Sequence, residues 1–158
     1  MADDDRQLLA LDLTRSFLPE EAADGLARGV CRLLDAIGYA PICEAPLGSG
    51  RRADVLGMSA RGRFVIIEIK SGLADFRADQ KWRDYLAHCD RFYFAVGVGF
   101  PRAVLPEETG LLIADRFGAE LVREAPLQPM AAGLRRRQAV RFGRIAANRL
   151  RFLHAETG

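Results

Sequence analysis

The chain has 158 residues, which is the size of a single domain, and its 49% of hydrophobic residues suffices for a buried core. Three cysteines and two histidines are scattered without a paired spacing, which excludes zinc fingers, HExxH metalloproteases and Cys/His nucleophile sites. No apolar run approaches the length of a membrane span, and the first residues, MADDDRQ, are acidic where a signal peptide is basic. We therefore expect one cytoplasmic domain over residues 1–158.

The net charge of +2 combines two opposed parts of the chain. Residues 1–50 hold nine acids and four arginines, whereas residues 51–158 hold nineteen bases and twelve acids. The excess of positive charge is strongest at the end, where residues 131–158 carry seven arginines and the single acid Glu156. Such a region attracts polyanions, so the basic part is where we expect a partner.

Two helices are expected first. Residues 1–18 hold an N-terminal helix, and Pro19 with the two acids that follow it is typical of the start of a second helix. The second helix is expected to run to Ile37, where Gly38 ends it. Its apolar residues recur at spacings of three and four and predict one face against the core: Leu26, Val30, Leu33, Leu34 and Ile37.

Three strands are expected next in the chain: residues 39–45, 52–58 and 63–70. Between the last two, residues 60–62 form a three-residue hairpin loop with Gly62 in the left-handed conformation. This loop pairs residues whose numbers sum to 122, which sets Asp54 opposite Glu68. A two-residue loop would instead shift the pairing by one residue and send Asp54 to the other face of the sheet.

A helix is expected over residues 75–88, with these residues on its inward side: Trp82, Tyr85, Leu86 and Cys89. The apolar run RFYFAVGV predicts a strand covered on both faces. LLIAD and residues 119–123 predict a hairpin, and the two prolines of EAPLQPM precede a long helix over residues 131–153. This order of elements predicts an α/β fold in which a mixed sheet carries helices on both faces.

Charged residues end the apolar strand at 63–70, where Glu68 and Lys70 share one face. With Asp54 opposite, two carboxylates converge, and they repel each other unless a cation such as Mg²⁺ or Mn²⁺ lies between them. Asp54, Glu68 and the carbonyl of Ile69 form a plausible partial metal shell. Lys70 would then orient or deprotonate an attacking water, as in phosphodiester hydrolysis. A salt bridge at a strand end is the alternative, because so short a pattern also arises by chance.

The order of elements and the motif made by Asp54 and Glu68-Ile69-Lys70 resemble the core of the PD-(D/E)XK nucleases, which have the restriction-endonuclease-like fold. Ala53 stands where the name of the motif has proline, a residue that supplies no ligand. Longer segments, including GRRADVLGM and VIIEIKSGLADFRADQKWRDYLAHCDRFYFAV, resemble the MmcB family of bacterial DNA repair proteins over about residues 24–153. The resemblance implies an endonuclease of DNA repair on an α-β-β-β-α-β core.

The superfamily resemblance also implies a further acid at the site. Members often carry it on the first helix of the core, where Glu20, Glu21 and Asp24 are the alternatives. Glu44, at the end of the first strand and just before a glycine-rich loop, is the preferred residue. The other interpretation of Glu44 is a solvated strand end.

Related nucleases carry a glutamine and a tyrosine on the helix after the motif, where the pair supports the site and touches DNA. Gln80 and Tyr85 are five residues apart here rather than four, which departs from the spacing in those nucleases. Lys81 and Tyr85 do share a helix face, and Lys81 is a candidate DNA contact. An ordinary amphipathic helix explains the same positions.

The long C-terminal helix is expected to pack by one face and to present arginines on the other. The apolar stripe consists of Ala139, Phe142, Ala146, Leu150 and Leu153. The opposite side carries the candidate phosphate contacts Arg137, Arg141, Arg144 and Arg151. Arg51 and Arg52 add positive potential beside Asp54. A solvated charged face and a membrane-binding face are the alternatives.

Three hypotheses follow for the function. The first is a metal-dependent DNA endonuclease that recognises structure rather than sequence. Its expected partners are damaged, branched or single-stranded DNA and repair proteins. The second is a DNA-binding repair adaptor that keeps the nuclease fold and does not cleave. The third is a structural domain in which the charges form only salt bridges. RNA remains open as a ligand.

Overall fold

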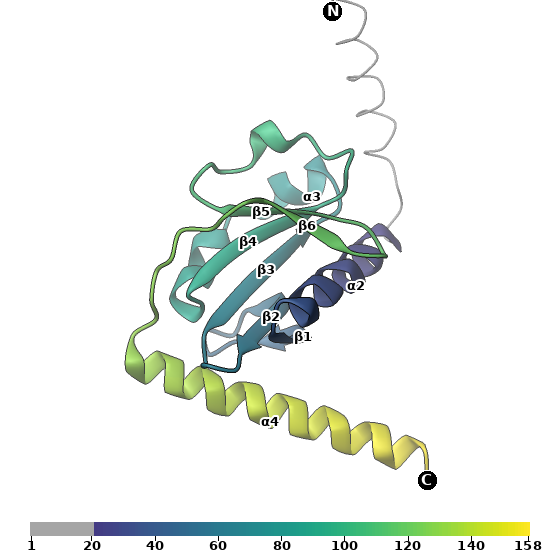
Figure 1. Cartoon of the computed structure of the whole chain (residues 1–158), viewed down its shortest axis with the longest axis vertical. Helices are drawn as coiled ribbons and strands as arrows, with labels where there is room; N and C mark the ends of the chain where they lie inside the picture. Colours follow the sequence, from purple (N-terminus) through teal and green to yellow (C-terminus); the bar gives the residue numbers. More distant parts are fainter. Residues whose placement is uncertain (1–20) are drawn as a thin grey trace, which may run out of the picture.

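The computed structural model describes residues 21–158, which form one sheet with helices on both faces (Figure 1). The helices in this part of the chain are α2 (Glu21–Ala36), α3 (Leu73–Ala78) and α4 (Ala132–Glu156), with the 3₁₀ helices η1 (Trp82–His88) and η2 (Arg102–Val104). The strands are β1 (Tyr39–Pro46), β2 (Arg52–Ser59), β3 (Phe64–Lys70), β4 (Arg91–Val96), β5 (Gly110–Ala114) and β6 (Ala119–Arg123). The N-terminal helix expected within residues 1–18 lies outside the described residues.

The six strands lie side by side in chain order, from β1 to β6. β1, β2 and β3 are antiparallel, β3, β4 and β5 are parallel, and β6 is antiparallel to β5. The predicted mixed α/β sheet and its final hairpin are therefore confirmed. Each parallel step needs a crossover connection, which α3 with η1 supplies before β4 and the η2 loop supplies before β5.

The hairpin between β2 and β3 has the predicted register. Gly62 has a φ of 74°, which is the left-handed conformation that a three-residue loop requires. Val55 pairs with Ile67, so the numbers of paired residues sum to 122 as expected. Asp54 and Glu68 come next in this register, and both lie where the hairpin ends.

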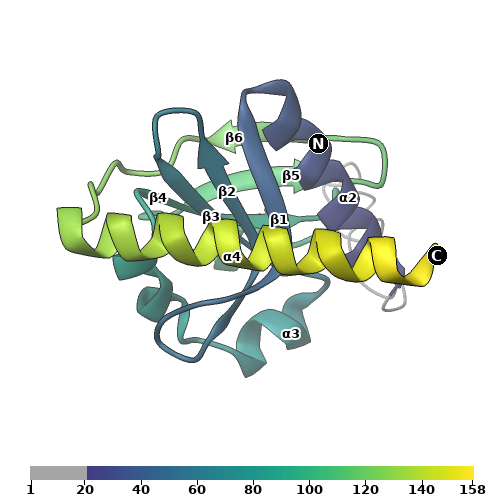
Figure 2. The same ribbon diagram turned by 90° about the horizontal axis from the view of Figure 1, so that it is seen from below.

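Two apolar clusters form because side chains alternate between the two faces of the sheet. On one face α2 packs Leu26, Val30 and Leu34 against residues of the central strands. On the other face α3, η1 and the first part of α4 cover the sheet with Phe76, Trp82, Tyr85 and Phe142. Figure 2, which views the molecule from below, shows α4 lying across the sheet, close to β1. The central strand β3, covered on both faces, is buried along its whole length.

The prediction of one continuous helix over residues 75–88 is wrong, because the chain forms two separate helices there, α3 and η1. Side chains at the break bind backbone groups that a helix would use. The Gln80 Nε2 atom donates to the carbonyl of Phe76 at 2.6 Å, and Asp79 Oδ1 accepts from the amide of Lys81 at 3.1 Å. Such local bonds compete with helical hydrogen bonds and allow the chain to turn.

Predicted core positions at the ends of α2 and α4 are also wrong. Ile37 is 59% exposed, because α2 ends at Ala36 and the chain turns away at Gly38, which has a φ of 89°. The apolar stripe of α4 packs only in its first half, where Phe142 is buried. Ala146, Leu150 and Leu153 are exposed. In Figure 1 the last turns of α4 extend beyond the sheet, so no core lies under them. Within residues 21–158 no helix combines the length and apolar character that a bilayer span requires.

Gly29 allows α2 to lie directly on the turn between β5 and β6. A Cβ atom there would lie 1.9 Å from the carbonyl oxygen of Asp115 and 2.4 Å from that of Gly118. We expect Gly29→Ala to lower the free energy of unfolding by about 2–3 kcal/mol. The added methyl group would clash with these two carbonyl oxygens, and only a shift of α2 away from the turn would relieve the clash. Gly25→Ala is the control, since its Cβ would come no closer than 3.4 Å to Arg116. Equal urea midpoints for the two variants would contradict this packing.

Candidate functional site

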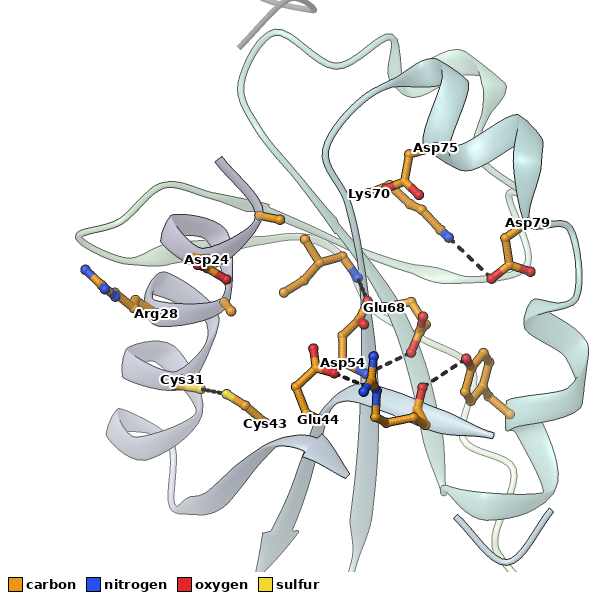
Figure 3. Close-up of a pocket in the computed structure, with 15 residues that line it drawn as sticks. Asp24, Arg28, Cys31, Cys43, Glu44, Asp54, Glu68, Lys70, Asp75 and Asp79 are labelled. Atoms are coloured by element: carbon orange, nitrogen blue, oxygen red, sulfur yellow. Dashed lines mark hydrogen bonds and ion pairs between the residues drawn. The ribbon is translucent and has the colours of Figure 1, made fainter. Parts of the chain in front are cut away.

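A cavity of about 630 Å³ opens between α2, the ends of β1, β2 and β3, and the segment around α3 (Figure 3). It contains the charged residues that the sequence analysis singled out on β2 and β3. Its carboxylates come from five elements or their adjoining segments: Asp24, Glu44, Asp54, Glu68, Asp75 and Asp79. Lys70, Arg28 and Arg52 also line it. The cavity is therefore lined by many acids and by a few bases.

Asp54 and Glu68 are held together across the end of the β2–β3 hairpin. The amide of Asp54 donates to Glu68 Oε1 at 3.1 Å, and the amide of Ile69 donates to Asp54 Oδ2 at 2.8 Å. Each side chain thus uses one oxygen to bind the backbone of the neighbouring strand. The predicted convergence of these two carboxylates is confirmed, and its cause is the hairpin register.

Both carboxyl groups are poorly solvated. Burial, followed by the nearby Asp54 charge, raises the pKa of Glu68 to about 8. Burial also raises the pKa of Asp54, although its hydrogen bond from the Ile69 amide acts in the opposite direction. A pair of desolvated carboxyls disfavours two negative charges, and either a shared proton or a bound cation relieves that cost.

The donor set fits a hard divalent cation. Mg²⁺ commonly takes one or two carboxylates from a protein and keeps several waters, and the open cavity beside Asp54 and Glu68 leaves room for them. Each carboxylate has a second oxygen beyond the one that binds the neighbouring strand. Among the described residues no three His, Cys, Asp or Glu side chains come together as a metal-binding group. The site therefore offers two carboxylates, and not a complete cage of side chains.

Lys70 lies on the cavity wall and is only 5% exposed. Its Nζ atom lies 3.7 Å from Asp79 Oδ2, in the break between α3 and η1. Figure 3 shows the side chain of Lys70 directed toward Asp79 and away from the Asp54 carboxylate. Asp79 was not among the predicted site residues, because its position depends on the helix break, which the residue pattern did not reveal.

Glu44 reaches the cavity on a distorted part of β1. Its φ of 52° is unusual for a residue other than glycine. Glu44 stands between the ladder pairs Cys43–Val55 and Ala45–Ala53, which places it at the level of Asp54 on the neighbouring strand. Its carboxylate binds Arg52 at 2.6 Å, and both side chains are more than half exposed.

Of the alternatives for the further acid, the structure describes the side chain of Asp24, on α2. Asp24 lines the cavity, as Glu44 does, so the arrangement brings both acids to the site. Glu21 is the first residue of α2, and Glu20 lies outside the described residues. Among the candidates whose side chains the structure describes, Glu44 and Asp24 line the same cavity as Asp54 and Glu68.

The helix after the motif contributes Tyr85 to the cavity. Tyr85 is buried, and its hydroxyl donates to the carbonyl of Arg52 at 3.2 Å. Gln80 instead binds the end of α3. The two residues therefore have separate roles: Tyr85 lines the cavity, and Gln80 terminates α3. Lys81 is exposed beside the same break.

The candidate DNA contacts differ in their surroundings. Arg51 binds Asp84 at 2.9 Å, and Arg52 binds Glu44, so acids already neutralise part of their charge. Of the candidates on α4, Arg137, Arg144 and Arg151 are exposed, whereas Arg141 is partly buried. Arg149 was not among the predicted contacts, and its guanidinium donates to the carbonyls of Cys43 and Glu44. Arg149 joins the second half of α4 to the rim of the cavity.

These features describe an α/β protein with a carboxylate-lined cavity at the edge where β1, β2 and β3 meet α2. Residues 13–157 match the family described as DNA repair protein MmcB-like, and the chain belongs to this family. No curated protein matches the chain.

Two solved structures are similar to the chain. SPO1766, a protein of unknown function from Silicibacter pomeroyi, is 44% identical, with a TM-score of 0.84 over 89% of this chain and 97% of that one. A repair endonuclease from Pyrococcus abyssi is 24% identical, with a TM-score of 0.35 over 50% of this chain and 39% of that one. The first shares nearly the whole architecture. The second similarity is too partial to carry an argument.

Proposed function

We propose that this DNA repair family member is a metal-dependent DNA endonuclease with a restriction-endonuclease-like core. The observation that carries the proposal is the desolvated pair of Asp54 and Glu68, with Lys70 on the wall of the same open cavity. Desolvated carboxylates beside a buried ammonium in a cleft are characteristic of sites that perform chemistry. A purely structural ion pair does not require an open cavity of this size.

Mg²⁺ or Mn²⁺ would be held by Asp54, Glu68 and the carbonyl of Ile69, and it would supply charge stabilisation at a phosphodiester. The protein residues have separate tasks. The backbone amides of Asp54 and Ile69 hold the two carboxylates in place. The Lys70 ammonium donates a hydrogen bond to the attacking water or to a phosphate oxygen and stabilises negative charge that develops there. Glu44 or Asp24 orients a water on the opposite side of the cavity.

A metal titration separates the nuclease from a protein that only binds DNA. We expect calorimetry with Mn²⁺ to show binding by the wild-type chain and its loss in Asp54→Asn, with DNA affinity retained in that variant. The Asn side chain keeps the shape of Asp54 and removes the charge that binds the cation. Metal binding that is unchanged in Asp54→Asn would contradict the assignment of this site.

The second candidate function is a DNA-binding repair adaptor that does not cleave. It is favoured by the absence of a third metal-binding side chain among the described residues and by the direct pairing of Lys70 with Asp79. In the adaptor, DNA affinity would be the same with metal and with chelator. In the nuclease, cutting requires the metal, and DNA that is bound without metal stays intact.

DNA is proposed to lie along the arginines of α4 and to reach the cavity where Arg149 meets β1. The exposed residues Arg137, Arg144 and Arg151 carry charge that no acid of the described chain neutralises through an ion pair. Phosphate contacts of this kind supply affinity without reading the sequence of bases. The proposed recognition is therefore directed at DNA structure.

Replacing Arg137, Arg144 and Arg151 together by glutamine is expected to weaken duplex binding by about 10–100-fold at low salt. The slope of log affinity against log salt should fall by about 2–3, because each phosphate contact contributes about 0.9 to it. Binding isotherms at several salt concentrations measure both quantities. The control replaces three exposed arginines away from α4, Arg32, Arg102 and Arg116, by glutamine. An equal loss of duplex affinity in the control would contradict DNA binding along α4.

A further inference from the structure

Two cysteines that are distant in the sequence meet at the wall of the cavity. Cys31 lies on α2 and Cys43 on β1, and their Sγ atoms are 3.4 Å apart (Figure 3). Both side chains are partly buried, and both line the open cavity. The third cysteine, Cys89, is 2% exposed in the apolar cluster on the other face of the sheet. The contact thus involves the two thiols that a small solute in the cavity can reach.

We propose that Cys31 and Cys43 form a reversible disulfide when a hydroperoxide enters the cavity. A disulfide bond is about 2.0 Å long, so the sulfurs need to approach by about a further 1.4 Å. Rotation of the two side chains, together with movement of α2 against β1, would close this gap. The proposal does not depend on the proposed nuclease function.

The reaction balances with the peroxide as the oxidant. One cysteine sulfur attacks a peroxide oxygen, an S–O bond forms, the O–O bond breaks, and the thiol proton leaves with the departing oxygen as water or an alcohol. The second sulfur then attacks the resulting sulfenic acid. An S–S bond forms, the S–O bond breaks, and a water molecule leaves with the second thiol proton. The two thiols lose two electrons, and the peroxide gains them.

The disulfide would fasten α2 to β1 beside the candidate acids. Cys43 directly precedes Glu44, whose backbone is already in a left-handed conformation. Arg149 binds the carbonyls of both residues, so this part of β1 is also joined to α4. Oxidation would therefore fix the wall that carries Glu44 and link three elements around the cavity.

The test treats the full chain with hydrogen peroxide, blocks remaining thiols with iodoacetamide and maps the peptides by mass spectrometry. We expect a peptide pair joined through Cys31 and Cys43, a protein mass lower by about 2 Da before blocking, and recovery of both thiols with dithiothreitol. The melting temperature of the oxidised chain should rise by roughly 5 °C or more, because the bond closes a loop in the unfolded chain.

Single variants provide the controls. Cys31→Ser and Cys43→Ser should each abolish the cross-linked peptide and the shift in melting temperature, while Cys89→Ser should retain both. Oxidation of either thiol to sulfinic or sulfonic acid without a cross-link would overturn the proposal. Disulfides between two copies of the chain, or a bond that includes Cys89, would overturn it as well.

Discussion

Lys70→Met is expected to lower the rate of metal-dependent DNA cleavage by about 10²–10⁴-fold while leaving DNA affinity within a few-fold of the wild type. The Lys70 ammonium is nearly fully buried in the wall of the cavity that holds Asp54 and Glu68. Methionine keeps much of the volume of the aliphatic stem and removes the charge that we propose to stabilise the reacting phosphate. Single-turnover rates at saturating DNA isolate this effect from binding.

The control for this variant is Arg77→Met, which removes an exposed positive charge from α3 without touching the cavity wall. It should cleave at nearly the wild-type rate. Thermal unfolding must show that Lys70→Met is folded, and a small change is expected because its partner Asp79 is 40% exposed. If folded Lys70→Met cleaved DNA at the wild-type rate, Lys70 would have no role in the reaction.

Asp90→Asn is expected to lower the free energy of unfolding by about 3–4 kcal/mol, the largest effect on stability that we anticipate. Asp90 is 2% exposed and accepts hydrogen bonds from the amides of Phe64 and Met130 at 2.8 and 3.0 Å. It also binds the guanidinium of Arg135 at the start of α4. An amide in its place presents N–H groups to these donors and leaves part of the charge of Arg135 unpaired. Urea unfolding at neutral pH measures the loss.

The same residue predicts a dependence of stability on pH. Burial alone would raise the pKa of Asp90, but hydrogen bonds from Arg135, Phe64 and Met130 hold it at about 2, below its ordinary value of 3.8. The stabilisation of the fold by ionised Asp90 is therefore complete above about pH 4. It decreases by roughly 2 kcal/mol as the pH falls toward 2. The difference in stability between wild type and Asp90→Asn should shrink over this window. A constant difference down to pH 2 would contradict the assignment.

The sequence predicted the sheet and the carboxylate pair because both follow from local rules. Alternation of side chains along a strand set the face of Glu68, and Gly62 set the loop length that placed Asp54 opposite. The position of Glu44 in the β1–β2 ladder could not be predicted with the same certainty, since its left-handed backbone departs from regular strand geometry.

Other features depend on contacts that the residue pattern does not contain. The break before η1 arises from the side-chain bonds of Asp79 and Gln80, and it alone brings Asp79 to Lys70. The exposed end of α4 follows from where the sheet stops, which periodicity does not report. The contact between Cys31 and Cys43 requires the docking of α2 on β1, because the two residues belong to different elements.

The most direct test of the central claim is the cleavage of DNA by the wild-type chain with Mg²⁺, with Mn²⁺ and with a chelator. Single-stranded, duplex, nicked, flapped and branched DNA should be compared, since the proposed recognition concerns structure. We expect cutting of at least one of these substrates with metal and none with chelator. Binding to every substrate with no cutting in either metal would contradict the nuclease and favour the adaptor.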